Sequence, residues 1–185
     1  MNQPPENFRR IAATHLQTFA AACLKSAGMT DEHAAQLAEL LTNSDRRGVR
    51  SHGTRALHGY CRSIRDNNAN PDPNIQVIRE TDTHVYIDGD GSLGYAPTML
   101  ATEKAIEKAK NKGIAVGAAC YTGHYGSAGH YVRRAMAEDS PHFRCRPPTH
   151  NTIRATRTNE PPITATHHYA SGCPDKKALL WSSMW

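Results

Sequence analysis

Three short segments of this 185-residue chain combine residue types that can do chemistry. The first runs from Arg50 to Arg55 and contains Ser51 and His52 side by side. A histidine beside a serine can serve as a tunable acid or base, and Arg55 offers a fixed positive charge suited to a carboxylate. The alternative is a helix start with Ser51 as its cap and with His52 and Arg55 facing solvent. Spacing alone favours this alternative.

The second segment, Thr122 to His130, surrounds His124 with three glycines. It lies between an apolar run and an expected helix, where α/β proteins place ligands beyond the end of a strand. Amide groups at 126–129 could bind an anion. Glycines are costly in such density unless something approaches the backbone closely. The functional interpretation and a plain turn are therefore evenly balanced here.

The third segment, Gly89 to Gly94, matches GxGxxG, follows an expected strand and precedes an expected helix. That context is typical of a dinucleotide-binding turn. However, the next strand runs into Tyr121 rather than an acidic residue, and Asp90 would repel a phosphate. The pattern taken alone favours a tight strand-to-helix turn.

Metal and disulfide chemistry find little support in the sequence. The five cysteines are odd in number and contain no CxxC pair, which favours reduced thiols and a cytoplasmic protein. His124 and His130 have no Cys, Asp or Glu at usable ligand spacing, so no metal is expected.

Charge and hydropathy restrict the classes of partner that the chain is expected to bind. No apolar run approaches the length that a bilayer requires, and the first residues lack a signal-like segment, so no membrane partner is expected. Residues 1–140 carry a net charge of +1, whereas residues 141–185 carry +4. The basic character therefore belongs to the tail, which disfavours nucleic acid as a partner of the whole chain.

Periodicity divides the chain into three parts. Residues 1–6 are expected to be disordered, residues 7–140 to form an α/β domain, and residues 141–185 to be a disordered, non-homologous tail. In the middle part, apolar spacing predicts a helix from about residue 8 that Gly28 ends, and Thr30 as the cap of a second. The later elements are a helix near Gly53, a loop at 67–73, strands at 75–78 and 84–87, a helix at 96–112, a strand at 114–120 and a helix at 127–139.

Two of these segments together resemble the malate/L-lactate dehydrogenase family, a group that also contains ureidoglycolate and sulfolactate dehydrogenases and diketogulonate reductase. Arg47 to Gly53 is similar to its RGVxSHG segment, and Gly123 to Gly129 is similar to its NHFGxAG stretch. The resemblance covers residues 7–140. It implies an α/β fold that is not a Rossmann fold: a helical N-terminal part, then part of a three-layer α/β/α mixed sheet, with an irregular C-terminal tail.

The resemblance also implies an activity: interconversion of 2-hydroxy acids and 2-oxo acids with NAD or NADP, by a homodimer. Ser51, His52 and His124 match the catalytic positions, and Arg55 is the candidate for substrate binding, one residue before the position of the usual arginine, Ala56. The cofactor-binding positions are His124, Tyr125, Gly126, Ser127 and Ala128.

Members of this family are markedly longer, so the resemblance indicates a truncated enzyme. A catalytically inactive fragment of the family is the alternative. A nucleic-acid-binding module that uses the basic tail is less favoured.

Overall fold

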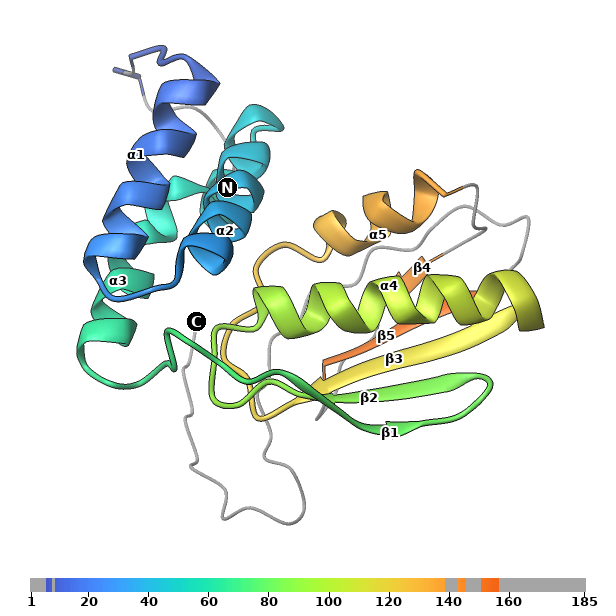
Figure 1. The fold of residues 1–185 in the computed structure, drawn as a ribbon. Helices are drawn as coiled ribbons and strands as arrows, with labels where there is room; N and C mark the ends of the chain where they lie inside the picture. The colour runs from blue at the N-terminus through green and yellow to red at the C-terminus, as the bar shows by residue number, and fades with distance from the viewer. Residues whose placement is uncertain (1–5, 8, 139–142, 146–150, 157–185) are drawn as a thin grey trace. The chain divides into compact units, whose positions relative to one another are not determined.

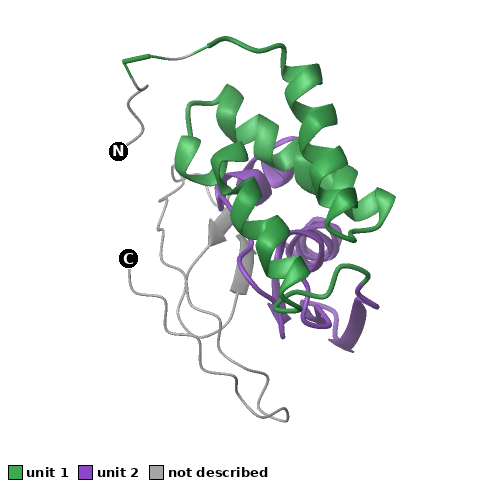
Figure 2. Cartoon of the chain, turned by 90° about the vertical axis from the view of Figure 1, so that its left-hand side faces the viewer, with its two compact units in different colours: residues 1–72 green, residues 73–185 purple. Residues whose placement is uncertain are grey.

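The structure, a computed structural model, describes residues 6–7, 9–138, 143–145 and 151–156 (Figure 1). The chain divides into two compact units, residues 1–72 and residues 73–185 (Figure 2). The first unit is helical and the second holds a mixed sheet. This order confirms the predicted fold class. The division falls at the loop 67–73, inside the predicted domain 7–140, whose boundaries stay predictions.

The described part of the first unit contains three α-helices: α1 (Ala13–Ser26), α2 (Asp31–Arg46) and α3 (Leu57–Arg65). Helix α1 packs against α2 and contacts α3, with Leu24 and Leu41 fully buried. Gly28, at a φ of 111°, forms the turn that α1 needs before Thr30 starts α2. The apolar stripe predicted from residue 8 becomes helical only at Ala13, because Ile11 stays exposed and packing does not support a helix there.

The second unit contains β1 (Gln76–Glu80), β2 (His84–Asp88), α4 (Tyr95–Lys112), β3 (Ile114–Cys120) and α5 (Gly129–Met136). Strands β1 and β2, which match the predicted strands at 75–78 and 84–87, are antiparallel neighbours. Strands β2 and β3 are parallel, and α4 makes the crossover between them. The helix predicted at 127–139 is shorter at both ends.

Helix α4 lies along the sheet because small residues let it approach (Figure 1). A Cβ at Gly117 of β3 would lie 2.4 Å from the carbonyl oxygen of Ala101. Val85, Ile87, Ala101 and Ala119 form the buried layer between helix and strands. Side chains this small give a thin but dense core, which suits a sequence rich in alanine.

Two further strands, β4 (Phe143–Cys145) and β5 (Asn151–Thr156), complete the sheet in the order β1-β2-β3-β5-β4. Strand β5 pairs antiparallel with β3, and β4 pairs antiparallel with β5. Both lie in 141–185, for which the sequence predicts irregular structure. The rest of that segment, and residues 1–5, lie outside the described residues, so those expectations stay predictions.

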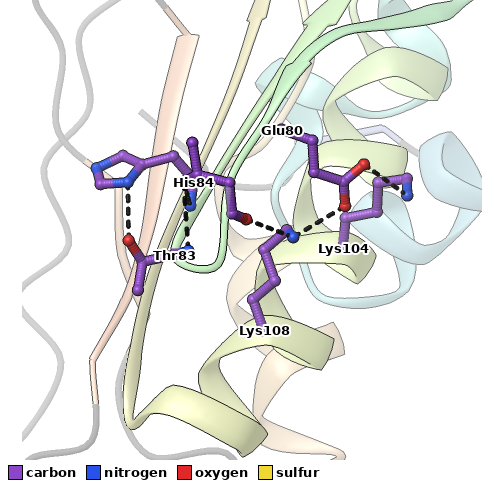
Figure 3. A network of polar contacts seen from close by, with 6 residues as sticks. Glu80, Thr83, His84, Lys104 and Lys108 are labelled. Atoms are coloured by element: carbon purple, nitrogen blue, oxygen red, sulfur yellow. Dashed lines mark hydrogen bonds and ion pairs between the residues drawn. The ribbon is translucent and has the colours of Figure 1, made fainter.

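Ion pairs fasten the β1–β2 hairpin to α4 (Figure 3). Glu80 accepts from Lys108 at 2.9 Å and from Lys104 at 3.5 Å, and Lys108 also donates to the carbonyl oxygen of Thr81 at 2.7 Å. The hydrogen bond from Lys108 is the main reason that the pKa of Glu80 lies below its ordinary value. Because Glu80 is exposed, these ion pairs add little to the free energy of unfolding.

A second carboxylate has a larger shift and gives a testable pH dependence. Glu138 accepts from Lys110 of α4 (2.7 Å) and from Arg134 of α5 (2.6 Å), and these bonds lower its pKa from 4.5 to about 2. The stability that Glu138 adds is therefore complete above pH 4.5 and is lost as the pH falls toward 2.

We expect the difference in unfolding free energy between wild type and Glu138→Gln to be constant above pH 4.5 and to shrink steadily below it. Urea unfolding at a series of pH values measures this. Glu107→Gln is the control, since Glu107 is an exposed residue of α4 for which no ion pair is found within the described ranges. A difference that persists unchanged at pH 2 would contradict the assignment.

Candidate functional site

The two parallel strands end side by side. Asp88, the last residue of β2, is in register with Cys120, the last residue of β3. The segments that follow, 89–94 and 121–128, therefore leave the sheet at the same edge, where α/β proteins form ligand sites. The fold thus brings together the GxGxxG and the histidine turn.

Main-chain hydrogen bonds join segment 89–94 to segment 121–128 and to Cys120, the last residue of β3. In each bond, the amide of a glycine donates to a carbonyl across the edge, so the join does not depend on side-chain chemistry. The four bonds are Gly89 N to Cys120 O (2.9 Å), Gly91 N to Tyr121 O (2.8 Å), Gly123 N to Ser92 O (2.7 Å) and Gly94 N to His124 O (3.0 Å).

Gly94 shows why this contact needs glycine. A Cβ at Gly94 would lie 2.6 Å from the carbonyl oxygen of Gly123 and 2.7 Å from Oγ1 of Thr122. The carboxylates of Asp88 and Asp90 accept bonds from main-chain amides nearby, at 2.9 and 3.0 Å. These contacts favour the turn interpretation of the GxGxxG: its glycines allow two segments to touch.

Backbone strain marks the same edge. Asp90 and Tyr121 both adopt left-handed conformations, with φ of 51° and 48°. Residues with a Cβ rarely adopt this conformation unless their surroundings hold them in it, and such residues cluster at functional sites. Asp90 is the second residue after β2 and Tyr121 the first after β3, and this position supports the hypothesis that the edge binds a ligand.

His124 is half-buried within this edge, and the amide of Gly126 donates to its Nδ1 at 3.3 Å. An Nδ1 that accepts carries no hydrogen, so the neutral ring has its hydrogen on Nε2. In this tautomer Nε2 donates a hydrogen bond and does not take up a proton. The local geometry thus gives His124 the character of a hydrogen-bond donor.

Two buried tyrosines hold the turn around His124, and sequence reasoning missed both. The hydroxyl of Tyr131 donates to the carbonyl oxygen of Tyr125 at 2.5 Å, and the two rings lie 5.7 Å apart. The ring of Tyr95 covers Gly126, where a Cβ would lie 2.5 Å from it. The only sequence signal for them was an aromatic residue directly after the GxGxxG and another in the helix after the turn.

Removal of the Tyr131 hydroxyl is expected to destabilise the second unit by ~1–3 kcal/mol, because Tyr131→Phe leaves a buried carbonyl without its donor. Urea unfolding measures the loss, and hydrogen exchange at the Gly126 amide reports whether the turn loosens. Unchanged stability and exchange would show that the tyrosine acts only through its ring.

The other predicted cofactor positions differ in exposure. Ser127 is half-buried, and its carbonyl accepts from the amide of His130 at 3.0 Å. Tyr125 and Ala128 are buried and pack in the cluster around Tyr131. A contact to a ligand at Ala128 would therefore come from its main chain.

The other predicted catalytic segment lies in the first unit, between α2 and α3. It folds as two short 3-10 turns, η1 (Arg50–His52) and η2 (Thr54–Ala56), so α3 begins at Leu57 and not near Gly53. Ser51 Oγ lies 2.8 Å from Nδ1 of His52. A hydroxyl can accept from Nδ1–H, which leaves Nε2 as the nitrogen that exchanges a proton.

The charged and titratable side chains of these two turns differ in burial. His52 is half-buried, and burial lowers its pKa below 6.5. Arg55, the predicted substrate ligand, is exposed. Nη1 of Arg50 is buried and has no hydrogen-bond partner among the residues that the structure describes. A shielded guanidinium nitrogen of this kind attracts an anion, a feature that the sequence alone did not reveal.

His52 belongs to the first unit and His124 to the second, so their joint action on one substrate stays a prediction. Within the described ranges, no three His, Cys, Asp or Glu side chains are grouped to hold a metal ion. Nor does any helix described there combine the length and apolar character of a bilayer span.

One buried hydroxyl at the strand edge could pair with a polar group of a nicotinamide cofactor. Ser92 is 3% exposed, and its hydroxyl finds no partner in the described part of the chain. Such a hydroxyl costs about 1–3 kcal/mol unless a polar ligand group pairs with it. Ser92 and the main chain of 124–128 are the residues that would hold the cofactor there.

A helical unit followed by a mixed sheet, with a histidine turn at the carboxyl edge of its parallel strands, defines an α/β protein with a candidate ligand site at that edge. A profile of the malate/L-lactate dehydrogenase family matches residues 11–175, beyond residue 140, where the resemblance quoted above ends. The protein belongs to this family, whose members are dehydrogenases.

Similarity to individual members of the family supports this assignment. The chain is 38% identical over 133 residues to malate dehydrogenase of Pyrococcus horikoshii, a match that covers 72% of this chain and 37% of that one. It is 37% identical over 135 residues to L-sulfolactate dehydrogenase of Methanocaldococcus jannaschii, with 73% and 37% covered. The solved malate dehydrogenase structure from P. horikoshii OT3 superposes with a TM-score of 0.70 at 32% identity, over 85% of this chain and 49% of that chain. The chain therefore spans well under half the length of these curated relatives.

Proposed function

We propose that this chain carries catalytic residues of an NAD- or NADP-dependent oxidoreductase that interconverts 2-hydroxy acids and 2-oxo acids. The observation that carries the proposal is the Ser51–His52 pair, in which a hydroxyl 2.8 Å from Nδ1 orients a half-buried imidazole. The names of the relatives, dehydrogenases of malate and sulfolactate, support this substrate class.

The chemistry needs one hydride and one proton. When bound, the nicotinamide supplies or accepts the hydride. In the reductive direction, negative charge develops on the substrate oxygen, and the imidazolium of His52 donates a proton to it. In the oxidative direction, neutral His52 takes the hydroxyl proton, while Ser51 keeps the ring oriented throughout.

The remaining residues bind and orient. Because Nδ1 of His124 accepts from the amide of Gly126, Nε2 carries the hydrogen and offers it as a hydrogen-bond donor to the bound ligand. Arg55 offers positive charge to the substrate carboxylate, and Arg50 is a second cation on the same pair of turns. The segment from His124 to Ala128 contacts the cofactor.

The oligomeric state and the cellular location are also part of the proposal. A homodimer follows from the family resemblance, and a cytoplasmic location agrees with Cys23, Cys61 and Cys120, which are free thiols in the described ranges.

Calorimetry with NADH and with NADPH, followed by cofactor oxidation with oxaloacetate, pyruvate or a cyclic imine, tests the function. We expect one cofactor to bind and to be oxidised only when an oxo acid or imine is added. A folded chain that binds neither cofactor and turns over no substrate would instead be a catalytically inactive fragment, the alternative that its coverage of 37% of the relatives keeps open.

A further inference from the structure

A carboxylate at the end of α2 reaches across to the turns that carry Ser51 and His52. Both the amide and the hydroxyl of Thr54 donate to Oδ2 of Asp45, at 2.8 and 2.6 Å. Asp45 lies in the last turn of α2, where the helix dipole disfavours negative charge. Helix stability therefore does not explain an aspartate here, whereas its contact with Thr54 does.

Gly53 fits this carboxylate closely. A Cβ at Gly53 would lie 1.8 Å from Oδ1 of Asp45 and 2.4 Å from its Cγ. The backbone of Gly53, at φ −95° and ψ −156°, is extended and open to any residue type. Position 53 therefore needs glycine because Asp45 occupies the space of a side chain, and not because of its backbone conformation.

Asp45 holds the segment at both ends. Its carbonyl accepts from the amide of Gly48 at 2.9 Å, at the start of the loop, and its carboxylate holds Thr54 at the far end. Between them, the amide of His52 donates to the carbonyl of Val49 at 3.1 Å. Ser44 shares the near end, since its carbonyl accepts from the amide of Val49 at 2.9 Å. The contact to Thr54 is therefore the one that depends on the aspartate side chain.

We propose that Asp45 is a positioning residue for the Ser51–His52 pair and acts through Gly53 and Thr54. The inference rests on the proposed function for the role of His52, but the geometry that it assigns to Asp45 can be tested without turnover. The Asp45 carboxylate accepts hydrogen bonds from Thr54, so it sets where the imidazole lies and is not assigned a step in the proton transfer.

The test uses ¹⁵N NMR of the His52 ring in the whole chain, because the Nδ1 and Nε2 shifts report which nitrogen carries hydrogen and what it contacts. Asp45→Ala removes the acceptor and is expected to change both shifts. Asp45→Asn keeps an acceptor oxygen for Thr54 and is expected to restore them. Asp31→Ala, at the first turn of the same helix, is the control and should leave the His52 ring unchanged.

A double-mutant cycle protects the test against loss of folding. Gly53→Ala in the wild-type background drives a methyl into the Asp45 carboxylate and is expected to lower the unfolding midpoint. In the Asp45→Ala background the same substitution should lower it much less, so the two effects are not additive. Thr54→Val keeps the amide donor alone and should shift the His52 ring less than Asp45→Ala does.

Additive effects in the cycle, or His52 shifts in Asp45→Ala equal to those of wild type, would overturn the inference. If cofactor turnover is measurable, Asp45→Ala should lower kcat by about 10- to 100-fold with Asp45→Asn close to wild type, because displaced reacting groups lose rate steeply. A chain without turnover whose His52 shifts still follow this pattern would refute the proposed function and leave the positioning role intact.

Discussion

Replacing His52 with glutamine is expected to lower the rate of 2-oxo acid reduction by ~10²- to 10⁴-fold, the usual contribution of a positioned acid. Glutamine has a comparable reach and forms hydrogen bonds, but its amide does not exchange a proton near neutral pH. Steady-state oxidation of the cofactor measures the loss. His58→Gln is the matched control, since His58 is an exposed residue of α3. Equal rates in wild type and His52→Gln would remove His52 from the mechanism.

The pH dependence of this effect has a definite sign. Burial lowers the pKa of His52 below 6.5, so its proton-donating form is abundant only at pH values below that lowered pKa. The reductive rate should fall as the pH rises through this pKa, and the oxidative rate should rise through it. Both limbs should disappear in His52→Gln. A limb centred above pH 6.5 would contradict the assignment.

His124 should respond differently to the same substitution. A glutamine amide can replace the hydrogen bond that Nε2 donates, so His124→Gln is expected to keep more activity than His124→Ala. If His124 instead exchanges the proton, both variants should lose activity equally. This comparison separates the two histidines by role.

Gly126→Ala is expected to destabilise the second unit by ~2–5 kcal/mol. About 1–2 kcal/mol comes from a Cβ in left-handed backbone, at a φ of 79°. A further ~1–3 kcal/mol comes from overpacking, since the methyl would lie 2.5 Å from the buried ring of Tyr95. Urea unfolding gives the total.

Gly113→Ala separates the two causes. Gly113 has nearly the same φ, 80°, in the same unit, but a Cβ there meets nothing within 4 Å. It should therefore lose only the ~1–2 kcal/mol of the backbone effect. Equal losses in the two variants would show that Tyr95 moves aside and does not hold the turn.

The sequence predicted the β2–α4–β3 part of the fold well because its signals are local. The run Ile114–Cys120 forms a strand at its predicted bounds, and α4 ends at Lys112 as expected, followed by Gly113 in left-handed backbone. Apolar runs and glycine stops act over a few residues, so spacing is enough to find them.

The features around the site were harder to predict because they depend on contacts between distant residues. The need for glycine at 53 comes from Asp45, eight positions earlier, and the need at 126 comes from Tyr95 on another element. The third helix was expected near Gly53, but Gly53 is extended and separates the two short turns. Neither contact leaves a periodic pattern in the sequence.

The four hydrogen bonds that join segment 89–94 to Cys120 and to segment 121–128 involve main-chain atoms alone. The half-buried side chain of Ser127 can therefore change while the main-chain frame is preserved. An edge built in this way is a suitable starting point for laboratory evolution of substrate preference, since substitutions there alter recognition without dismantling the support.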